Sequence, residues 1–169
     1  MILTREVIEA EIARGRLEFD PFDAKQIGPA SVDLHLGDEI RVLSDPAITV
    51  AVTDEPDYEA GTELRRLDAP YVLRPGETIH GITRERIRLP DDVAGWLEGR
   101  SRFARIGLMI HVTSGFVAPG VNGHQVLEMS NVSGRPLAIH AGVRLCQIVL
   151  QRCEGRAVYA GRFATQVRP

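Results

Sequence analysis

The feature that most constrains this chain is a series of short segments in which apolar and polar residues alternate. Val32, Leu34 and Leu36, for example, are separated by polar residues, and Gly37-Asp38 then predicts a turn. Alternation with a period of two places neighbouring side chains on opposite faces of a β-strand. Comparable segments are 48–52, 71–73, 78–83, 93–98, 109–112, 125–130, 137–139 and 145–150. Many short strands between turns rich in Gly and Pro predict a mainly β fold, a sandwich or barrel.

One short helix is predicted ahead of these strands. Thr4 is placed to act as its N-cap, and Gly15 is suited to the position just past its end. Between them, apolar residues at helical spacing form a stripe that would face the core: Val7, Ile8 and Ile12.

The chain shows no domain boundary, and we predict a single domain over residues 1–169. Residues 53–69 are acidic and polar, which predicts a long loop. Residues 154–169 contain several arginines and few core-forming side chains. This composition predicts a flexible C-terminal arm that becomes ordered on a ligand or on a neighbouring subunit.

Charge and cysteine content exclude several classes of protein. A formal net charge of −3 gives no overall basic field for a nucleic-acid backbone, although local arginines can still bind a small anion. No apolar run is long enough to span a membrane, and no signal peptide opens the chain. Cys146 and Cys153 form neither a C-x-x-C pair nor a disulfide framework. We therefore expect a cytoplasmic protein with reduced thiols.

The histidines do not predict a metal site. No two have the i, i+4 spacing of a helical metal pair, and no C-x-x-C pair accompanies them. The five histidines are His35, His80, His111, His124 and His140. We expect no zinc bound by side chains. The glycine motifs of phosphate-binding loops, G-x-x-x-x-G-K-[ST] and G-x-G-x-x-G, are also absent.

A basic segment follows the strand predicted at 93–98. Arg100, Ser101, Arg102 and Arg105 lie close together just before an apolar run. A short helix here would offer backbone N–H groups, a hydroxyl and guanidinium groups to a phosphate. Composition alone favours a solvated basic turn.

Glu128 is unusual because it interrupts an apolar strand. Alternation places Val126 and Glu128 on one face, with Leu127 and Met129 on the other. A carboxylate in this setting is expected to be partly buried, which suits a group that takes up a proton and returns it. An ordinary exposed glutamate on a two-faced strand is the simpler interpretation.

Taken together, these segments resemble the dCTP deaminase family within the dUTPase-like superfamily, and the resemblance spans almost the whole chain. The segments that carry it begin with Met1-Ile2-Leu3 and continue through 29–37, 73–77, 89–95, 97–101, 107–116, 119–124, 127–128 and 130–131. The family implies a distorted β-barrel or jelly-roll subunit that assembles as a homotrimer. Its active sites lie between subunits and use Mg²⁺ bound by the nucleotide triphosphate, without zinc.

The resemblance also implies roles for particular residues. Glu128 matches the catalytic glutamate, which activates water for attack at cytosine C4 and delivers protons to the departing ammonia. Ser101 and Arg105 match residues that support the reacting base, its water and the phosphates, and Arg100 belongs to the same motif. The segment whose backbone reads the pyrimidine edge, and its continuation, correspond to His111, Val112, Thr113, Ser114 and Phe116.

Three positions depart from the family pattern on the sugar and phosphate side of the site. Ala118 stands where the family has an aspartate that contacts the sugar 3′-hydroxyl, and Arg102 stands where it has a second serine. The family's K-Y-Q-G-Q is replaced near the C-terminus, and the stretch after Tyr159 is shorter. The replacing residues are Arg162, Phe163, Ala164, Thr165 and Gln166.

These observations leave three functional hypotheses. The leading one is zinc-free hydrolytic deamination of dCTP to dUTP and ammonia. A bifunctional enzyme would continue to dUMP and pyrophosphate, and Ala118 argues against this second step because no carboxylate remains there to position water. A nucleotide-binding regulator without catalysis is motivated by three departures and opposed by three retained residues. The departures are Arg102, Ala118 and Phe163, and the retained residues are Glu128, Ser101 and Arg105.

Overall fold

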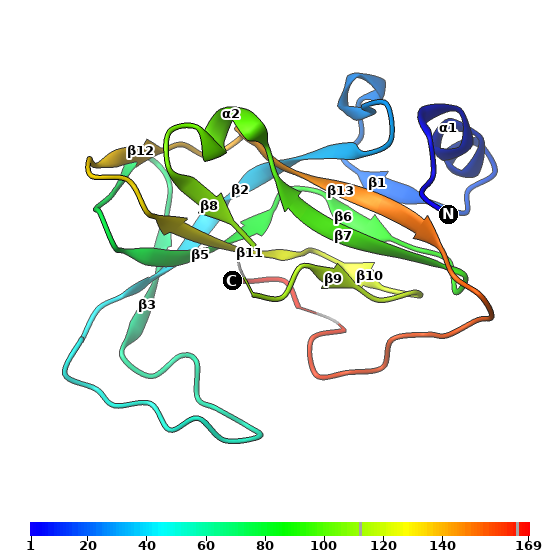
Figure 1. Cartoon of the computed structure of the whole chain (residues 1–169). Helices are drawn as coiled ribbons and strands as arrows, with labels where there is room; N and C mark the ends of the chain where they lie inside the picture. Colours follow the sequence, from blue (N-terminus) through cyan, green and yellow to red (C-terminus); the bar gives the residue numbers. More distant parts are fainter. Residues whose placement is uncertain (112, 165) are drawn as a thin grey trace.

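The chain folds into a strongly curled antiparallel sheet that forms half of a barrel (Figure 1), as the computed structural model of residues 1–111, 113–164 and 166–169 shows. The mainly β prediction, a distorted barrel with a short N-terminal helix, is therefore confirmed. The elements are α1 (Arg5–Ala13), β1 (Glu18–Asp20), η1 (Ala24–Gln26), β2 (Val32–Leu43), β3 (Thr62–Arg66), β4 (Tyr71–Leu73), β5 (Thr78–Thr83), β6 (Arg86–Arg88), β7 (Val93–Gly99), α2 (Ser101–Ala104), β8 (Leu108–Ile110), β9 (Phe116–Val117), β10 (Asn122–Gly123), β11 (Val126–Asn131), β12 (Leu137–Ile139) and β13 (Arg144–Arg152).

Strand β2 connects the two halves of the main sheet. The order of hydrogen-bonded strands is β8-β11-β5-β2-β13-β7-β9, with β3 paired to the far end of β2. The first part of β2, up to His35, pairs with β13; the strand pairs with β5 from Leu36 onward and with β3 from Glu39 onward. The turn predicted at Gly37-Asp38 is therefore wrong. The pairing of β2 with β5 shifts register between Leu36 and Ile40. A Cβ added to Gly37, within this stretch, would lie 3.0 Å from the Ile82 carbonyl oxygen.

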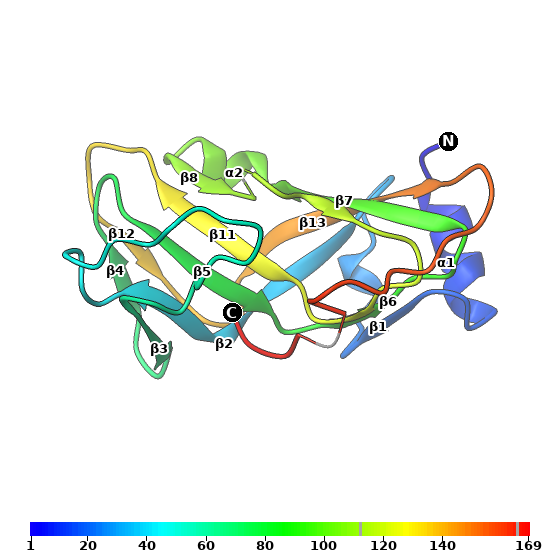
Figure 2. The ribbon, with the colours of Figure 1, turned by 90° about the horizontal axis from the view of Figure 1, so that it is seen from below.

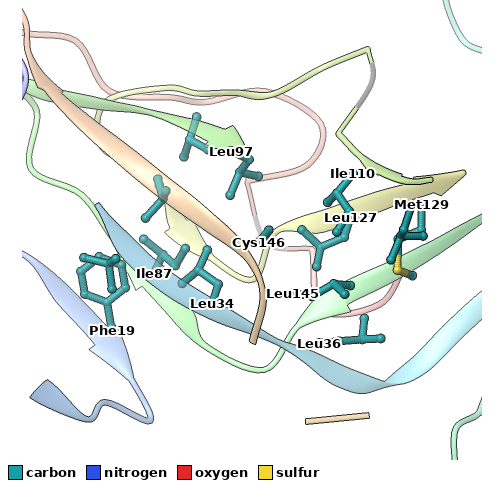
Figure 3. Close-up of a cluster of buried hydrophobic side chains, with 14 of the residues drawn as sticks. Phe19, Leu34, Leu36, Ile87, Leu97, Ile110, Leu127, Met129, Leu145 and Cys146 are labelled. Carbon is teal, nitrogen blue, oxygen red and sulfur yellow. The ribbon is translucent and has the colours of Figure 1, made fainter. Parts of the chain in front are cut away.

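One apolar core fills the concave side of this sheet (Figure 3). The inward-facing residues of β2 and β11 are fully buried, and α1 contributes Ile8 from outside the sheet. The predicted helix is confirmed, with Thr4 at its N-cap position and Gly15 at φ 67° just past its end. The Thr4 side chain, however, makes no capping hydrogen bond.

Two stretches differ from the strand prediction. Residues 48–52 form no strand: Ile48, Val50 and Val52 are all exposed in the loop between β2 and β3. Their alternation is insufficient because no neighbouring strand pairs with them. The predicted long loop at 53–69 instead contains β3, which pairs with β2 from Glu39 to Leu43.

The outward side of β5 and β11 is covered by two irregular segments. Figures 1 and 2 place the loop of residues 44–61 and the arm of residues 154–169 on the same side of the sheet. The arm runs along the β9–β10 turn, where the Tyr159 amide donates to the Pro119 carbonyl at 2.9 Å. These two segments and the sheet enclose the candidate site.

Gly81 sets how closely β5 approaches the core. It faces inward opposite Leu127 and Ile40, and an added Cβ would lie 2.5 Å from Leu36 Cδ1 and 2.8 Å from Met129 Cε. The space that a side chain would occupy is filled by its neighbours.

We therefore predict that Gly81→Ala lowers the free energy of unfolding by about 1–3 kcal/mol, the usual effect of overpacking a filled core. Urea denaturation monitored by circular dichroism measures this change. The matched control is Gly134→Ala, because a Cβ at Gly134 meets nothing within 4 Å. Equal stability of the two variants would contradict the prediction.

Candidate active site

The candidate site is a cavity of about 510 Å³ on the outward side of β5 and β11. This volume lies within the range of small-molecule sites. Its walls come from the loop of residues 44–61, from β5, β7, β9 and β11, and from the arm. The lining residues are Pro56, Tyr58, His80, Leu97, His111, Ser114, Phe116, Val117, Ala118, Val121, Gly123, His124, Gln125, Val126, Glu128, Tyr159, Phe163, Ala164, Gln166 and Pro169.

Glu128 reaches this cavity because of the alternation in β11. Leu127 and Met129 are completely buried in the core, and Val126 and Glu128 face the cavity, as predicted. Thr113 fixes the orientation of the carboxylate. Its hydroxyl donates to Glu128 Oε2 at 2.6 Å, and its backbone N–H donates to the same oxygen at 3.2 Å.

Of the imidazoles that line the cavity, those of His80 and His111 come from segments directly beside Glu128. His111 has φ 55°, and its backbone N–H donates to the Glu128 carbonyl at 2.9 Å. Burial lowers the pKa of His111, and the negative charge of Glu128 opposes this shift. Burial likewise lowers the pKa of His80, with Glu128 opposing and Arg41 adding to the shift. Both imidazoles are therefore mainly neutral near pH 7.

The arm of residues 154–169 forms another wall of the cavity. Tyr159, Phe163 and Gln166 line the cavity, whereas Arg162 is exposed beside it. The rings of Tyr58 and Phe163 meet edge to face with centroids 6.2 Å apart. The Arg162 guanidinium carbon lies 5.7 Å from the centroid of Tyr58 and 5.6 Å from that of Phe163. The loop and the arm thus contact each other over the cavity through aromatic and cation–π interactions.

The basic segment, for which composition alone favoured a turn, forms the short helix α2, but within a single chain it lies away from the cavity. Ser101, Arg102 and Arg105 are exposed and are not among the cavity's lining residues. Figures 1 and 2 show α2 on the side of the sheet opposite the arm. Arg100 is held at its base by an ion pair with Asp33 at 3.0 Å and donates to the Arg144 carbonyl at 2.9 Å.

The remaining predicted site residues either line the cavity, contact Glu128 or lie outside the described residues. Ser114, Phe116 and Ala118 line the cavity, and Thr113 contacts Glu128 directly. Val112 and Thr165 lie outside the described residues. In the part of the chain that is described, no cluster of three or more His, Cys, Asp or Glu side chains has the arrangement of a metal site. No helix there has the length and apolarity needed to cross a membrane.

Several residues that line the cavity are not predicted as site residues from the sequence. His80 faces Glu128 from the neighbouring strand, and Tyr58 reaches the cavity from an acidic loop. His124 is also a lining residue, and its ring lies 2.9 Å from the Thr83 carbonyl. The alternation within 78–83 places His80 on the outward face, but only the register with β11 shows that it lies opposite Glu128.

Comparison with solved structures identifies the class of fold. The 2′-deoxycytidine 5′-triphosphate deaminase of Agrobacterium tumefaciens superposes with a TM-score of 0.69 at 24% identity, covering 89% of this chain. This chain spans about half the length of that protein, 47%. The dUTPase of Streptococcus mutans gives a TM-score of 0.51 at 15% identity, covering 83% of this chain and 98% of that one. The fold is therefore dUTPase-like.

Within that class, the chain belongs to the dCTP deaminase-like family, whose sequence model matches residues 2–153. A relative from Acidothermus cellulolyticus, named "dCTP deaminase, dUMP-forming", is 40% identical over all of this chain and 93% of its own length. A relative of the same name from Mycolicibacterium vanbaalenii is 41% identical over 90% of this chain and 80% of its own. The resemblance found in the sequence is thereby confirmed.

The buried imidazole of His111 generates a pH prediction. Because its pKa is lower in the folded chain than in the unfolded chain, unfolding takes up a proton as the pH falls below about 6.5. Stability is then full above that pH and decreases through the window below it. His111→Asn tolerates the left-handed backbone and removes the titrating ring, so we expect a weaker dependence.

Urea denaturation at about pH 5 and about pH 7.5 measures this difference. The matched control is His140→Asn, which removes an exposed imidazole and should retain the wild-type dependence. A His111→Asn variant whose stability falls as steeply as that of the wild type would show that this ring does not contribute.

Proposed function

We propose that this protein deaminates dCTP hydrolytically and converts the product onward to dUMP. The observation that carries the proposal is the position of Glu128: a carboxylate held by Thr113 at the wall of a cavity of nucleotide size. The second step is supported by relatives of about 40% identity that are named as dUMP-forming enzymes. This choice differs from the leading hypothesis drawn from the sequence, which stopped at dUTP.

The proposed chemistry requires one group that exchanges protons twice. Glu128 takes a proton from water as the water oxygen attacks C4 of cytosine, and passes that proton to N3. It then takes the proton of the new hydroxyl and passes it to the amine. The C4–N bond breaks, ammonia leaves, and the carboxylate is restored. Thr113 keeps Oε2 in place while these transfers occur.

The basic residues would bind the triphosphate of dCTP. Ser101 and the guanidinium groups of Arg102 and Arg105 suit phosphate oxygens rather than a metal ion. Mg²⁺ would enter with the phosphates and partly neutralise their charge. The arm residues Arg162 and Gln166 lie beside the cavity, where they would contact the same end of the nucleotide.

One observation favours a second candidate function, release of dUTP without the second step. Ala118 lines the cavity with only a methyl group, so it offers no carboxylate to position a water molecule for attack on phosphate. The two candidates share the deamination and differ only in their products.

Incubation with dCTP and Mg²⁺, followed by separation of the products, tests the proposal. We expect ammonia, dUMP and pyrophosphate in equal amounts. The control is Glu128→Gln, which keeps size and hydrogen bonding but cannot take a proton, and should reduce kcat by roughly a thousandfold or more.

Accumulation of dUTP without pyrophosphate would establish the second candidate. Tight binding of dCTP without turnover would instead favour a regulator. Near-normal ammonia release by Glu128→Gln would refute the proposed role of the carboxylate.

The proposed site is completed by a neighbouring copy of the chain, in a homotrimer. In one chain, α2 lies on the side of the sheet opposite the arm, and neither Ser101 nor Arg105 lines the cavity that Glu128 lines. Large apolar side chains are also exposed: Trp96 and Phe116, which pack together with ring centroids 5.0 Å apart, are 45% and 51% exposed. Such a patch favours burial between subunits.

Mixing two inactive variants tests the shared site. Glu128→Gln and Arg105→Ala subunits, unfolded and refolded together in equal amounts, should recover about a quarter of wild-type activity, because a quarter of the sites then combine an intact Glu128 with an intact Arg105 from another copy. Light scattering should give about three times the mass of one chain, 18.6 kDa. Failure to recover activity from intact trimers would place both residues in one chain's site.

A further inference from the structure

Three adjacent strands bring a basic, a neutral and an acidic side chain into one row. His80 on β5 pairs with Arg41 on β2 and with Glu128 on β11. Ile79 and Gly81, on either side of His80, face the core, so His80 faces outward with Glu128. Residues directly opposite each other in an antiparallel sheet have Cβ atoms about 5 Å apart.

The row lies along the floor of the candidate site. His80 and Glu128 both line the cavity, and His111 follows on the far side of Glu128, where its backbone N–H donates to the Glu128 carbonyl. Figure 2 shows β2, β5 and β11 side by side beneath the loop of residues 44–61. A side chain at His80 is therefore a direct neighbour of the carboxylate.

Arg41, at the end of the row, forms contacts with residues other than His80. Its guanidinium donates to Thr62 Oγ1 and to Glu59 Oε1, both at 3.1 Å, and lies 5.8 Å from the centroid of the Tyr58 ring. Only 11% of the Arg41 side chain is exposed. His80 therefore lies between the guanidinium of Arg41 and the carboxylate of Glu128. His111 is a second titratable residue beside Glu128, on the side away from His80.

The two oxygens of Glu128 are not equivalent. Thr113 donates to Oε2 through both its hydroxyl and its backbone N–H. Among residues 1–111, 113–164 and 166–169, no group donates a hydrogen bond to Oε1 in this structure. Because burial keeps His80 mainly neutral, its imidazole has one N–H to donate and remains able to do so near pH 7.

We propose that His80 is a positioning residue for Glu128, which donates an imidazole N–H to Oε1 when the nucleotide is bound. The proposal rests on the proposed deamination. Thr113 and His80 would then hold one oxygen each, so that the carboxylate keeps one orientation while it exchanges protons with water and base. Loss of the imidazole leaves a carboxylate that is held on one side and binds its proton more tightly.

The experiment compares His80→Leu, His80→Gln and His80→Asn by the pH dependence of kcat and KM for ammonia release from dCTP. Since a hydrogen bond to a charged group accounts for roughly a tenfold to hundredfold effect, we expect His80→Leu to reduce kcat by about that factor. KM should change by less than about twofold, and the acidic limb of the kcat profile should move to higher pH. Gln or Asn, which place an N–H near one ring nitrogen, should restore most of kcat.

The matched control is Thr78→Val, which alters the same face of β5 two residues away and removes a hydrogen bond to Ser130. It should retain wild-type kcat, and thermal melting should show that all variants remain folded. An unchanged kcat profile in His80→Leu would overturn the proposal. So would Gln and Asn variants that are folded yet as impaired as Leu.

A second measurement does not depend on turnover. Titration of the His80 ring by NMR should give a lower pKa in Glu128→Gln than in the wild type, because the negative charge that raises it is gone. An unchanged titration would show that the two side chains do not interact, whatever the enzyme does. Absence of ammonia release from the wild type, with the expected NMR shift, would instead reject the proposed function and leave the contact standing.

Discussion

The structure depends on one strand that belongs to both halves of the barrel. The inward-facing side chains of β2, from Val32 through Leu36 to Val42, are almost fully buried, and the strand is hydrogen-bonded to β13, β5 and β3 along its length. Its pairing with β5 changes register between Leu36 and Ile40, around Gly37, where an added Cβ would lie only 3.0 Å from the Ile82 carbonyl oxygen. Burial of a continuous apolar row in β2 therefore fixes the curvature, and the curvature creates a concave core on one side and a functional face on the other.

On that face, the cavity is lined by alternate residues of strands whose other residues form the core. Leu127 and Met129 anchor β11, so Glu128 between them has little freedom to move. The same holds for His80 between Ile79 and Gly81 on β5. A site built on paired strands keeps its spacing more closely than one built on loops. The loop and the arm complete the walls of the cavity, and they contact each other through the rings of Tyr58 and Phe163.

Local patterns in the sequence were enough to locate most strands and the carboxylate. Segments 78–83 and 137–139 coincide with β5 and β12, because alternation there reflects one buried face. Alternation also placed Glu128 on the face opposite Leu127 and Met129, but only the resemblance to the family gave this carboxylate a catalytic role. Residues 48–52 show that alternation alone does not make a strand without a partner, and Gly37 shows that a glycine can bend a strand rather than end it. His80 and Tyr58 were missed because pairing register and loop path depend on contacts distant in sequence. The relation of Ser101 and Arg105 to Glu128 is also beyond a single sequence, since one folded chain leaves them apart.

The absence of a side chain at Gly81 has a consequence for how such a site can change during evolution or engineering. The floor beneath His80 and Glu128 has no spare volume, because Leu36 and Met129 already fill the space that another residue would need. A side chain at Gly81 would therefore have to displace Leu36 and Met129 directly beneath the strand that carries His80. New substrate preferences are more accessible from the rim, where Tyr58 and Phe163 are exposed on the loop and the arm and lie outside the buried core. Substitutions that change substrate preference are therefore expected mainly in the loop of residues 44–61 and in the arm.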